Sequence, residues 1–291
     1  MQRSDFRCFH RLRVRWSEVD IQKIVFNAHY LTYADCAMTE YWRALAFPYE
    51  AGMQALGGEV YLKKASIEYH ASARLDDLLD VGMRCARVGT TSLVFQAAMF
   101  AGERLLVTVE LVYVFADPAT QTKRAVPPAL RAMIEHFEAG GEMVELHVGS
   151  WATLGRDATA LRMAVFVQEQ GIDPALELDA HDAAAVHAVA YNRLGQPVAT
   201  ARLLYEAPGD ARIARIGRMA VHRVLRGQRW GRLVLDAMVQ AARERGDAQV
   251  TLHAQRSAAP FYRRAGFEAV GQPFDEAGIP HITMRRSLRG G

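Results

Sequence analysis

The sequence predicts an α+β protein of two domains, in which a long helix wrapped by an antiparallel sheet precedes an α/β domain with a mixed sheet. The chain has 291 residues, which favours two compact domains over one. Period-two alternation and a one-sided helix fill the first half, whereas strands and helices alternate in the second. Hydrophobic residues make up 51% of the chain and charged residues 23%, a globular balance that excludes wholesale disorder.

The first half is predicted to contain one strand, one helix and then four more strands. Residues 9–16 alternate long polar and apolar side chains from Arg11 onward, as a half-buried strand does. Between Tyr30 and Leu45 apolar residues recur at three- and four-residue steps, which predicts a long helix with one buried face. Further strands are expected at 59–70, 80–88, 92–100 and 104–115. One helix against an antiparallel sheet is an α+β layer.

Proline and glycine mark the boundary between the halves. Pro127-Pro128 ends the strand pattern, a short amphipathic stretch follows, and Ala139-Gly140-Gly141 is a flexible joint. We therefore expect a first domain over residues 1–138, a linker at 139–143 and a second domain over 144–291.

The second half alternates strands with helices. The helix at 230–245 carries a clear apolar stripe. We expect strands at 143–148, 186–191, 198–205, 212–221, 249–254, near Glu268 and at 281–284, and helices at 157–170, 230–245 and 258–264.

Composition narrows the class of protein further. No apolar run approaches the roughly 18 residues of a membrane span, and the first 15 residues lack the apolar stretch of an export signal, so we expect a cytoplasmic protein. Cys8, Cys36 and Cys85 are scattered, without metal-binding or redox spacing, and no metal is expected. A net charge of +3 is weak for nucleic-acid binding. Neither nucleic acid nor membrane is expected as a partner.

One carboxylate stands out between the first strand and the long helix. Asp20 lies near the expected helix start, where backbone N–H groups lack partners and carry partial positive charge. Such groups can polarise a thioester carbonyl while Asp20 serves as base or nucleophile. Spacing alone favours a simpler role for Asp20, as a turn or capping residue.

Two segments resemble the 4-hydroxybenzoyl-CoA thioesterase branch of the hotdog fold. They are Asp20-x-x-x-Ile24-Val25-Phe26-Asn27-x-x-Tyr30 and Ile67-Glu68-Tyr69-His70-Ala71-x-Ala73-Arg74-Leu75-Asp76-Asp77. The resemblance covers most of residues 9–117. It implies an acyl-CoA thioesterase in which Asp20 is the catalytic carboxylate and the backbone N–H of Asn27 polarises the thioester. It also implies that Thr91 and Ser92 border CoA in a neighbouring subunit, within a homodimer or homotetramer.

A glycine-containing loop precedes the helix expected at 230–245. The loop reads Arg226-Gly227-Gln228-Arg229-Trp230-Gly231-Arg232. At such a strand–loop–helix junction the backbone N–H groups and the helix dipole can hold a pyrophosphate. An Arg- and Gly-rich stretch is also a common solvated turn, so the loop needs its context.

The sequence around this loop, over about residues 144–286, resembles the GNAT acetyltransferase superfamily. The more specific signature is Phe261-Tyr262-x-x-x-Gly266-Phe267. The resemblance implies that loop 226–232 binds the CoA pyrophosphate and that Tyr262 protonates the departing thiolate; a buried, packed tyrosine is the alternative. It further implies that backbone groups bond the pantetheine arm at Met219, Ala220 and Val221. Arg229 stands where the family has the central loop glycine; another residue fits there if its φ is negative, and this departure puts close approach of the phosphate in doubt.

The acceptor side is marked by an acidic run and by single histidines. The run reads Glu177-Leu178-Asp179-Ala180-His181-Asp182. Carboxylates beside a cleft suit a cationic amine and can deprotonate its ammonium. His187 and Glu177 are our candidates for acceptor-side catalysis; a solvated loop and a satisfied strand histidine are the alternatives.

Together these features predict a bifunctional enzyme with acetyl-CoA or another CoA thioester as cosubstrate. The first domain hydrolyses acyl-CoA, and the second transfers acetyl to an unidentified amine. The rival hypothesis is that one domain, more readily the second because of Arg229, only binds acyl-CoA and regulates the other.

Overall fold

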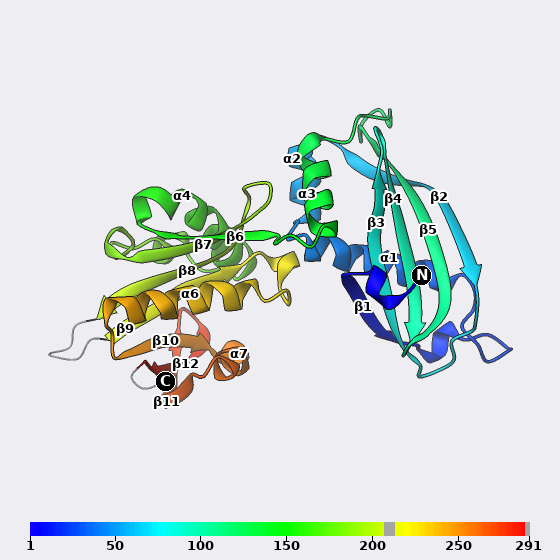
Figure 1. Cartoon of the computed structure of the whole chain (residues 1–291). Helices are drawn as coiled ribbons and strands as arrows, with labels where there is room; N and C mark the ends of the chain where they lie inside the picture. Colours follow the sequence, from blue (N-terminus) through cyan, green and yellow to red (C-terminus); the bar gives the residue numbers. More distant parts are fainter. Residues whose placement is uncertain (207–212, 289–291) are drawn as a thin grey trace. The chain divides into compact units, whose positions relative to one another are not determined.

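The computed structural model describes residues 1–206 and 213–288 and divides into two compact units, Met1–Met143 and Val144–Gly291 (Figure 1). The predicted fold class is confirmed, because the first unit is a helix against an antiparallel sheet and the second has a mixed sheet flanked by helices. Among the described residues, no helix has the length and apolar character of a membrane span.

The first unit contains five strands and three α-helices. In chain order they are β1 Cys8–Arg13, α1 His29–Ala44, α2 Tyr49–Leu56, β2 Glu59–Tyr69, β3 Leu78–Val88, β4 Ser92–Ala101, β5 Arg104–Ala116 and α3 Pro128–Glu138. All strand pairs are antiparallel, in the order β1-β3-β4-β5-β2.

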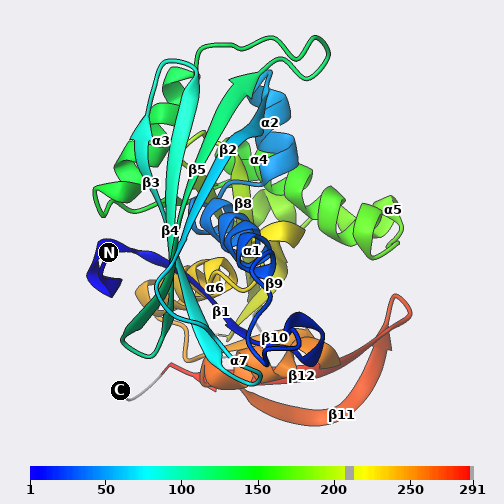
Figure 2. The ribbon, with the colours of Figure 1, turned by 90° about the vertical axis from the view of Figure 1, so that its right-hand side faces the viewer.

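Helix α1 forms the centre of the first unit. It lies against the sheet, as Figure 2 shows, and its buried residues follow the predicted three- and four-residue spacing. The ring of Tyr41 meets Phe95 of β4 and Phe137 of α3, each at 5.3 Å between centroids. The Tyr41 hydroxyl donates to Glu138 at 2.6 Å, which also accepts from the Cys85 backbone N–H at 2.7 Å. Helix α3 is thereby fixed to both α1 and the sheet.

Strand β2 forms one edge of this sheet. It pairs with β5 from Glu59–Ala116 to Tyr69–Val107, and no described strand covers its other side. Much of the strand is exposed, including Leu62 at 52%. An exposed strand of this length presents unpaired backbone donors and acceptors to another chain.

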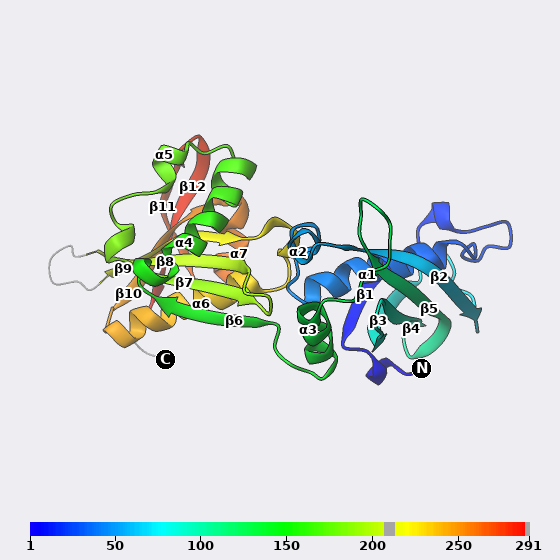
Figure 3. The same cartoon turned by 90° about the horizontal axis from the view of Figure 1, so that it is seen from above.

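In its described residues, 144–206 and 213–288, the second unit contains seven strands and four α-helices. They are β6 Val144–Gly149, α4 Trp151–Arg162, α5 Pro174–Glu177, β7 Val186–Asn192, β8 Pro197–Glu206, β9 Ile213–Val221, α6 Trp230–Arg245, β10 Gln249–Gln255, α7 Ala259–Arg264, β11 Glu268–Glu276 and β12 Ile279–Ser287. The sheet order is β11-β12-β10-β9-β8-β7-β6, with β9 and β10 parallel and the other pairs antiparallel. Strands β6 to β9 lie side by side in Figure 3, and α4 and α6 cover opposite faces in Figure 1.

Three elements differ from the sequence predictions. The first strand ends at Arg13 because the Glu18 carboxylate accepts the Arg15 backbone N–H at 2.7 Å and turns the chain into a 3₁₀ turn. Helix α2 was not predicted, although Pro48 before it and the left-handed Gly57 after it are ordinary helix boundaries. The helix expected at 157–170 starts earlier, at Trp151, and continues as a π-helical turn over Met163–Glu169.

Candidate functional site

The predicted hydrolytic site lies in the loop between β1 and α1. Asp20 closes a turn in which its N–H donates to the Ile24 carbonyl at 2.9 Å and its Oδ1 accepts the Gln22 N–H at 2.8 Å. Its side chain therefore has the turn-forming role that spacing alone favours. Within the described chain Oδ2 accepts no hydrogen bond, so one carboxylate oxygen remains free.

The free Oδ2 atom of Asp20 lies near the start of α1. Burial raises the pKa of Tyr30, in the first turn of this helix, and the negative charge of Asp20 adds to the effect. Just before the helix, the backbone N–H of Asn27 donates to no group in the described part of the chain. A free carboxylate oxygen and an unpaired N–H donor thus occur around one helix start.

The second resemblance segment braces this loop. Val25 N–H donates to the Ala73 carbonyl at 2.9 Å, and Ala73 N–H donates to the Tyr30 hydroxyl at 2.9 Å. The Tyr69 hydroxyl donates to the Asn27 carbonyl at 3.2 Å. Residues from both segments therefore hold the carboxylate and the helix start in place.

Glu18 is a buried acid in this loop that sequence reasoning missed. It is 3% exposed and accepts from the Arg15 side chain and from the Tyr33 hydroxyl, the latter at 2.7 Å. Burial alone would raise the pKa of Glu18, but these hydrogen bonds outweigh it and the pKa lies below its ordinary value. The three-residue spacing of Arg15 and Glu18 was the available signal. Glu18 positions the loop and is not exposed to a substrate.

Thr91 and Ser92 lie at the other end of the sheet. Ser92 begins β4 and stands opposite Val114, which in turn pairs with Tyr61 of β2. The Asn27 carbonyl is instead bonded by Tyr69, eight residues further along β2, which corresponds to roughly 26 Å of strand. One subunit alone does not bring Thr91 and Ser92 to the Asp20 loop.

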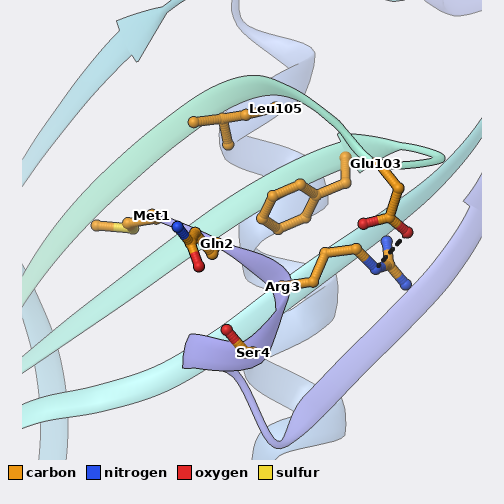
Figure 4. Close-up of a pocket in the computed structure, with 7 residues that line it drawn as sticks. Met1, Gln2, Arg3, Ser4, Glu103 and Leu105 are labelled. Atoms are coloured by element: carbon orange, nitrogen blue, oxygen red, sulfur yellow. Dashed lines mark ion pairs between the residues drawn. The ribbon is translucent and has the colours of Figure 1, made fainter.

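A separate pocket of about 350 Å³ occurs in the first unit and takes no residue from the Asp20 loop (Figure 4). An ion pair between Arg3 and Glu103 at 3.7 Å crosses it. Its lining is Met1, Gln2, Arg3, Ser4, Phe100, Glu103 and Leu105.

In the second unit the central parallel strands diverge. Strands β9 and β10 pair only from Ile213–Gln249 to Arg215–Thr251, although they continue to Val221 and Gln255. A cavity of about 520 Å³ is lined by residues of both strands beyond the paired stretch. The divergence opens a slot between two strands that a slender ligand could enter.

The three predicted strand residues lie on β9 along this divergence. Met219 lines the cavity, whereas Ala220 and Val221 pair with β8 at Thr200 and Ala199. Just before them, Arg218 has a positive φ of 50° within a register shift of the β8–β9 ladder.

Tyr262 of α7 also lines the cavity. Its hydroxyl contacts the Met219 sulfur at 3.6 Å, and burial raises its pKa to about 12. The phenol is therefore protonated near neutral pH and can act as a proton donor.

The loop between β9 and α6 presents unpaired backbone donors. The N–H groups of Gly227, Arg229, Trp230 and Gly231 donate to no acceptor in the described chain. Gly231 allows close packing, since a Cβ there would lie 3.2 Å from the Val221 side chain. This geometry suits a diphosphate, because consecutive N–H groups and a helix start face negative charge favourably.

The loop side chains are mostly engaged elsewhere. Arg226 makes two hydrogen bonds to Glu169, at 2.6 and 2.7 Å, and Arg232 pairs with Asp236 at 2.7 Å. Gln228 lies between Gly227 and Arg229 in the same loop. With Arg226 and Arg232 engaged in this way, the backbone N–H groups are the donors that this loop offers to an anion.

Arg229 does not have the negative φ at which a residue other than glycine is readily accommodated. It caps α6 in the left-handed conformation, with φ 67° and ψ 6°. For residues other than glycine this conformation has a steric cost of about 1–2 kcal/mol.

Neither acceptor-side candidate is a free base. His187 is 1% exposed, its Nε2 lies 2.9 Å from the Asp182 carbonyl, and burial lowers its pKa. It is not among the described residues that line the cavity. Glu177 does line the cavity, but it is 2% exposed and its carboxylate is paired with Arg162.

The acidic run is part of a buried ion network that sequence reasoning missed. Asp182 accepts from Arg162 and Arg202 at 2.8 Å each, and Arg202 also bonds Asp179 at 2.7 Å. Burial alone would raise the pKa of Asp182, but these arginine hydrogen bonds outweigh it and the pKa is lowered. Because arginines neutralise the run, it does not form the cation-attracting cluster that the sequence suggested.

Across residues 1–206 and 213–288, no three His, Cys, Asp or Glu side chains are grouped to hold an ion. Cys8 and Cys85 are buried, which raises the pKa of each thiol to about 12, and Cys36 is exposed.

Comparison with known proteins relates each unit to a family. Residues 22–108 match the thioesterase superfamily and residues 156–288 match the acetyltransferase (GNAT) domain. Over 122 residues the chain is 34% identical to the acyl-CoA thioester hydrolase YbgC of Escherichia coli, covering 42% of this chain and 90% of YbgC. Over 139 residues it is 30% identical to the uncharacterized protein YyaT of Bacillus subtilis, covering 45% of this chain and 88% of YyaT.

A solved acyl-CoA N-acyltransferase from Pseudomonas aeruginosa is 33% identical, with a TM-score of 0.45, and covers 50% of this chain and 99% of that one. The family matches show that the chain belongs to the thioesterase superfamily through its first unit and to the GNAT acetyltransferases through its second. The predicted fusion is thereby confirmed.

Proposed function

We propose that the protein is a bifunctional enzyme of CoA thioesters, which hydrolyses acyl-CoA in its first unit and transfers acetyl from acetyl-CoA to an amine in its second. The observation that carries the proposal is that unpaired backbone donors occur before two helices, at Asn27 before α1 and at Gly227, Arg229, Trp230 and Gly231 before α6. Both suit the negative charge of a CoA thioester during binding or reaction.

Hydrolysis uses the loop between β1 and α1. The Asn27 N–H polarises the thioester carbonyl, and the free Oδ2 of Asp20 acts as general base for water or as nucleophile. Attack forms a C–O bond at the carbonyl carbon, and collapse breaks the C–S bond and releases CoA. The hydrogen bonds made by Tyr69 and Ala73 hold the Asn27 N–H and the Asp20 carboxylate in position before substrate binds.

A second subunit completes this site in the proposal. Antiparallel pairing of β2 with its copy would reverse the strand direction, so the Ser92 end of one sheet would lie beside the Asp20 end of the other. Thr91 and Ser92 would then border the CoA bound at the partner's loop. The exposed edge of β2 supports a homodimer or a tetramer built from dimers.

Acetyl transfer uses the slot between β9 and β10. The backbone at Met219, Ala220 and Val221 bonds the pantetheine arm, and loop 226–232 binds the diphosphate through its N–H groups. The Tyr262 hydroxyl gives its proton to the sulfur that leaves, as its contact with Met219 on β9 supports.

The second candidate function is that the GNAT unit binds acyl-CoA without turnover. The left-handed Arg229 favours this alternative, since it puts a side chain at the loop's central position.

One experiment separates the two functions. Thiol release from a panel of acyl-CoAs is measured on the full chain, alone and with primary amines, beside acetyl-CoA binding by calorimetry. Hydrolysis without amine and additional release with amine support the bifunctional enzyme. Acetyl-CoA binding to the second unit without amine-dependent release supports the sensor.

A further inference from the structure

The cavity of the second unit has a polar wall whose side chains have no role in the acetyl transfer proposed above. The wall is formed where β10, β12 and β11 lie next to one another. Figure 2 shows that the tip of the β11–β12 hairpin curves away from β10. The cavity-lining side chains that concern the argument are His253 of β10, Glu276 of β11 and His281 of β12.

Glu276 fixes the protonation pattern of His253. The Nδ1 atom of His253 lies 3.1 Å from Oε2 of Glu276. An ionised carboxylate only accepts hydrogen bonds, so Nδ1 carries the proton and Nε2 of the neutral ring carries a lone pair. No described group bonds this Nε2, and the His253 side chain is 36% exposed. The imidazole therefore presents a free basic nitrogen, backed by a negative charge.

His253 lies where the central strands diverge. The last parallel pair is Arg215–Thr251, and His253 is two residues beyond it on the same face of β10. The cavity continues along β9 through Gly217 and Met219 to Tyr262. One cavity thus holds a proton donor, Tyr262, and a proton acceptor, His253.

His281 provides an internal comparison. It is diagonal to His253 across the β10–β12 ladder, where His253 faces Thr283 and Gln255 faces His281. Its Nδ1 lies 2.7 Å from the Ile279 carbonyl. His281 therefore lacks the carboxylate partner that His253 has in Glu276.

We propose that His253, positioned by Glu276, is the general base that deprotonates the acceptor amine. The inference rests on the proposed acetyl transfer. The ammonium gives one proton to Nε2 of His253, which passes it to solvent. The amine lone pair then forms a C–N bond at the thioester carbon, and the C–S bond breaks. The sulfur takes the Tyr262 proton, and the nitrogen's second proton restores Tyr262.

Other titratable or charged groups face the same cavity. They are Glu177, Asp179, His181, Arg202, Arg215, Arg218 and His281. Asp179 is paired with Arg202 and Arg218, so these charges largely neutralise one another. Glu276 is the carboxylate that contacts His253.

The test compares two nucleophiles that differ in their need for a base. Spermidine and tyramine are ammonium ions at pH 7 and require deprotonation, whereas hydroxylamine is already neutral. Thiol release from acetyl-CoA is measured with each for the full chain and for His253→Gln, Glu276→Gln and His281→Gln, beside acetyl-CoA binding by calorimetry.

The expected loss is selective. His253→Gln reduces transfer to the ammonium probes by about a hundredfold or more, but changes the hydroxylamine rate and acetyl-CoA binding by less than about threefold. Glu276→Gln gives a smaller loss with the ammonium probes, because the glutamine Oε1 can still accept from Nδ1 of His253, and it changes the hydroxylamine rate by less than about threefold. His281→Gln leaves both nucleophiles within about threefold of the original rate.

If His253→Gln lowers the transfer rate equally with the ammonium probes and with hydroxylamine, the assignment is overturned. A selective loss with the ammonium probes in His281→Gln would also overturn it. If the unmodified chain binds acetyl-CoA but transfers acetyl to none of the probes, the proposed transferase function is refuted, and the assignment of His253 with it.

Discussion

The Arg226 guanidinium makes two hydrogen bonds to the Glu169 carboxylate, at 2.6 and 2.7 Å. This pair joins the π-helical turn to the glycine-containing loop before α6; Phe166 of the turn and Gln170 after it line the cavity. The first side chain of the loop is thus engaged with the turn, and in the proposed function the backbone N–H groups bind the diphosphate. The pair lowers the pKa of Glu169, mainly through the Arg226 hydrogen bonds.

Asp20→Asn should abolish acyl-CoA hydrolysis while the fold remains intact. The asparagine Oδ1 can still accept the Gln22 N–H, but the amide cannot act as base or nucleophile. We expect at least a hundredfold loss, roughly, in thiol release, with an unchanged circular dichroism spectrum. Asp35→Asn, on the exposed face of α1, is the matched control. Near-normal hydrolysis by Asp20→Asn would remove the residue from the mechanism.

Leu62→Glu should dissociate the proposed dimer. Leu62 is 52% exposed on the edge strand β2, so the monomer fold tolerates the change, but two like charges would meet across a two-fold strand pair. Analytical ultracentrifugation should show a lower mass and a parallel loss of hydrolysis. Val148→Glu, on the edge strand β6 of the other sheet, should keep the original mass. A monomeric, fully active unmodified chain contradicts the two-subunit site.

Tyr262→Phe should slow acetyl transfer more than it weakens acetyl-CoA binding. The change removes the proton donor but keeps the ring that packs against Phe261 and Phe267. Because burial raises the Tyr262 pKa to about 12, this phenol contributes no alkaline limb to the rate profile below that pH. A loss of about tenfold or more in kcat is expected. Equal losses in rate and affinity would indicate a packing role, and Tyr191→Phe is the control.

Arg229→Gly should be more stable than Arg229→Ala. Both variants remove the guanidinium, but only glycine relieves the positive φ of 67°. The steric gain of about 1–2 kcal/mol is reduced by about 0.4–1 kcal/mol through the greater freedom of unfolded glycine. Urea unfolding should therefore separate the two variants by up to about 1.6 kcal/mol. A more stable alanine variant would argue against strain at this position.

Asp182→Asn should destabilise the second unit by about 3–5 kcal/mol at pH 7, because two buried arginines lose their shared charge partner. The folded-state pKa of Asp182 is lowered, so its contribution is present above the ordinary aspartate pKa of 3.8 and is lost as pH falls below that value. Urea unfolding at pH 7 and pH 3 should show the difference shrink. Asp236→Asn, in an exposed pair with Arg232, should cost less than about 1 kcal/mol at either pH.

The fold could be predicted from the sequence because the patterns that indicate it are local. The spacing from Tyr30 to Leu45 reports which side of that helix is buried, and apolar runs between turn signals locate β3 to β5. The site was only partly predictable. Arg162 and Arg202 each reach Asp182 across twenty residues of chain, and no local pattern marks such a pair. The conformation of Arg229 was likewise missed, because the surrounding loop imposes it against the residue's own preference.

Because Met163–Glu169 form a π-helical turn, the number of residues in this segment determines how the residues after it are oriented. In an α-helix each residue advances the chain by about 100°, so removing one residue before Glu169 would rotate everything after it by that amount. Glu169 would swing off Arg226, and Gln170 would part from Gln255, which now donates to it at 2.9 Å. A deletion that made the helix more regular would thus uncouple the cavity wall from the loop.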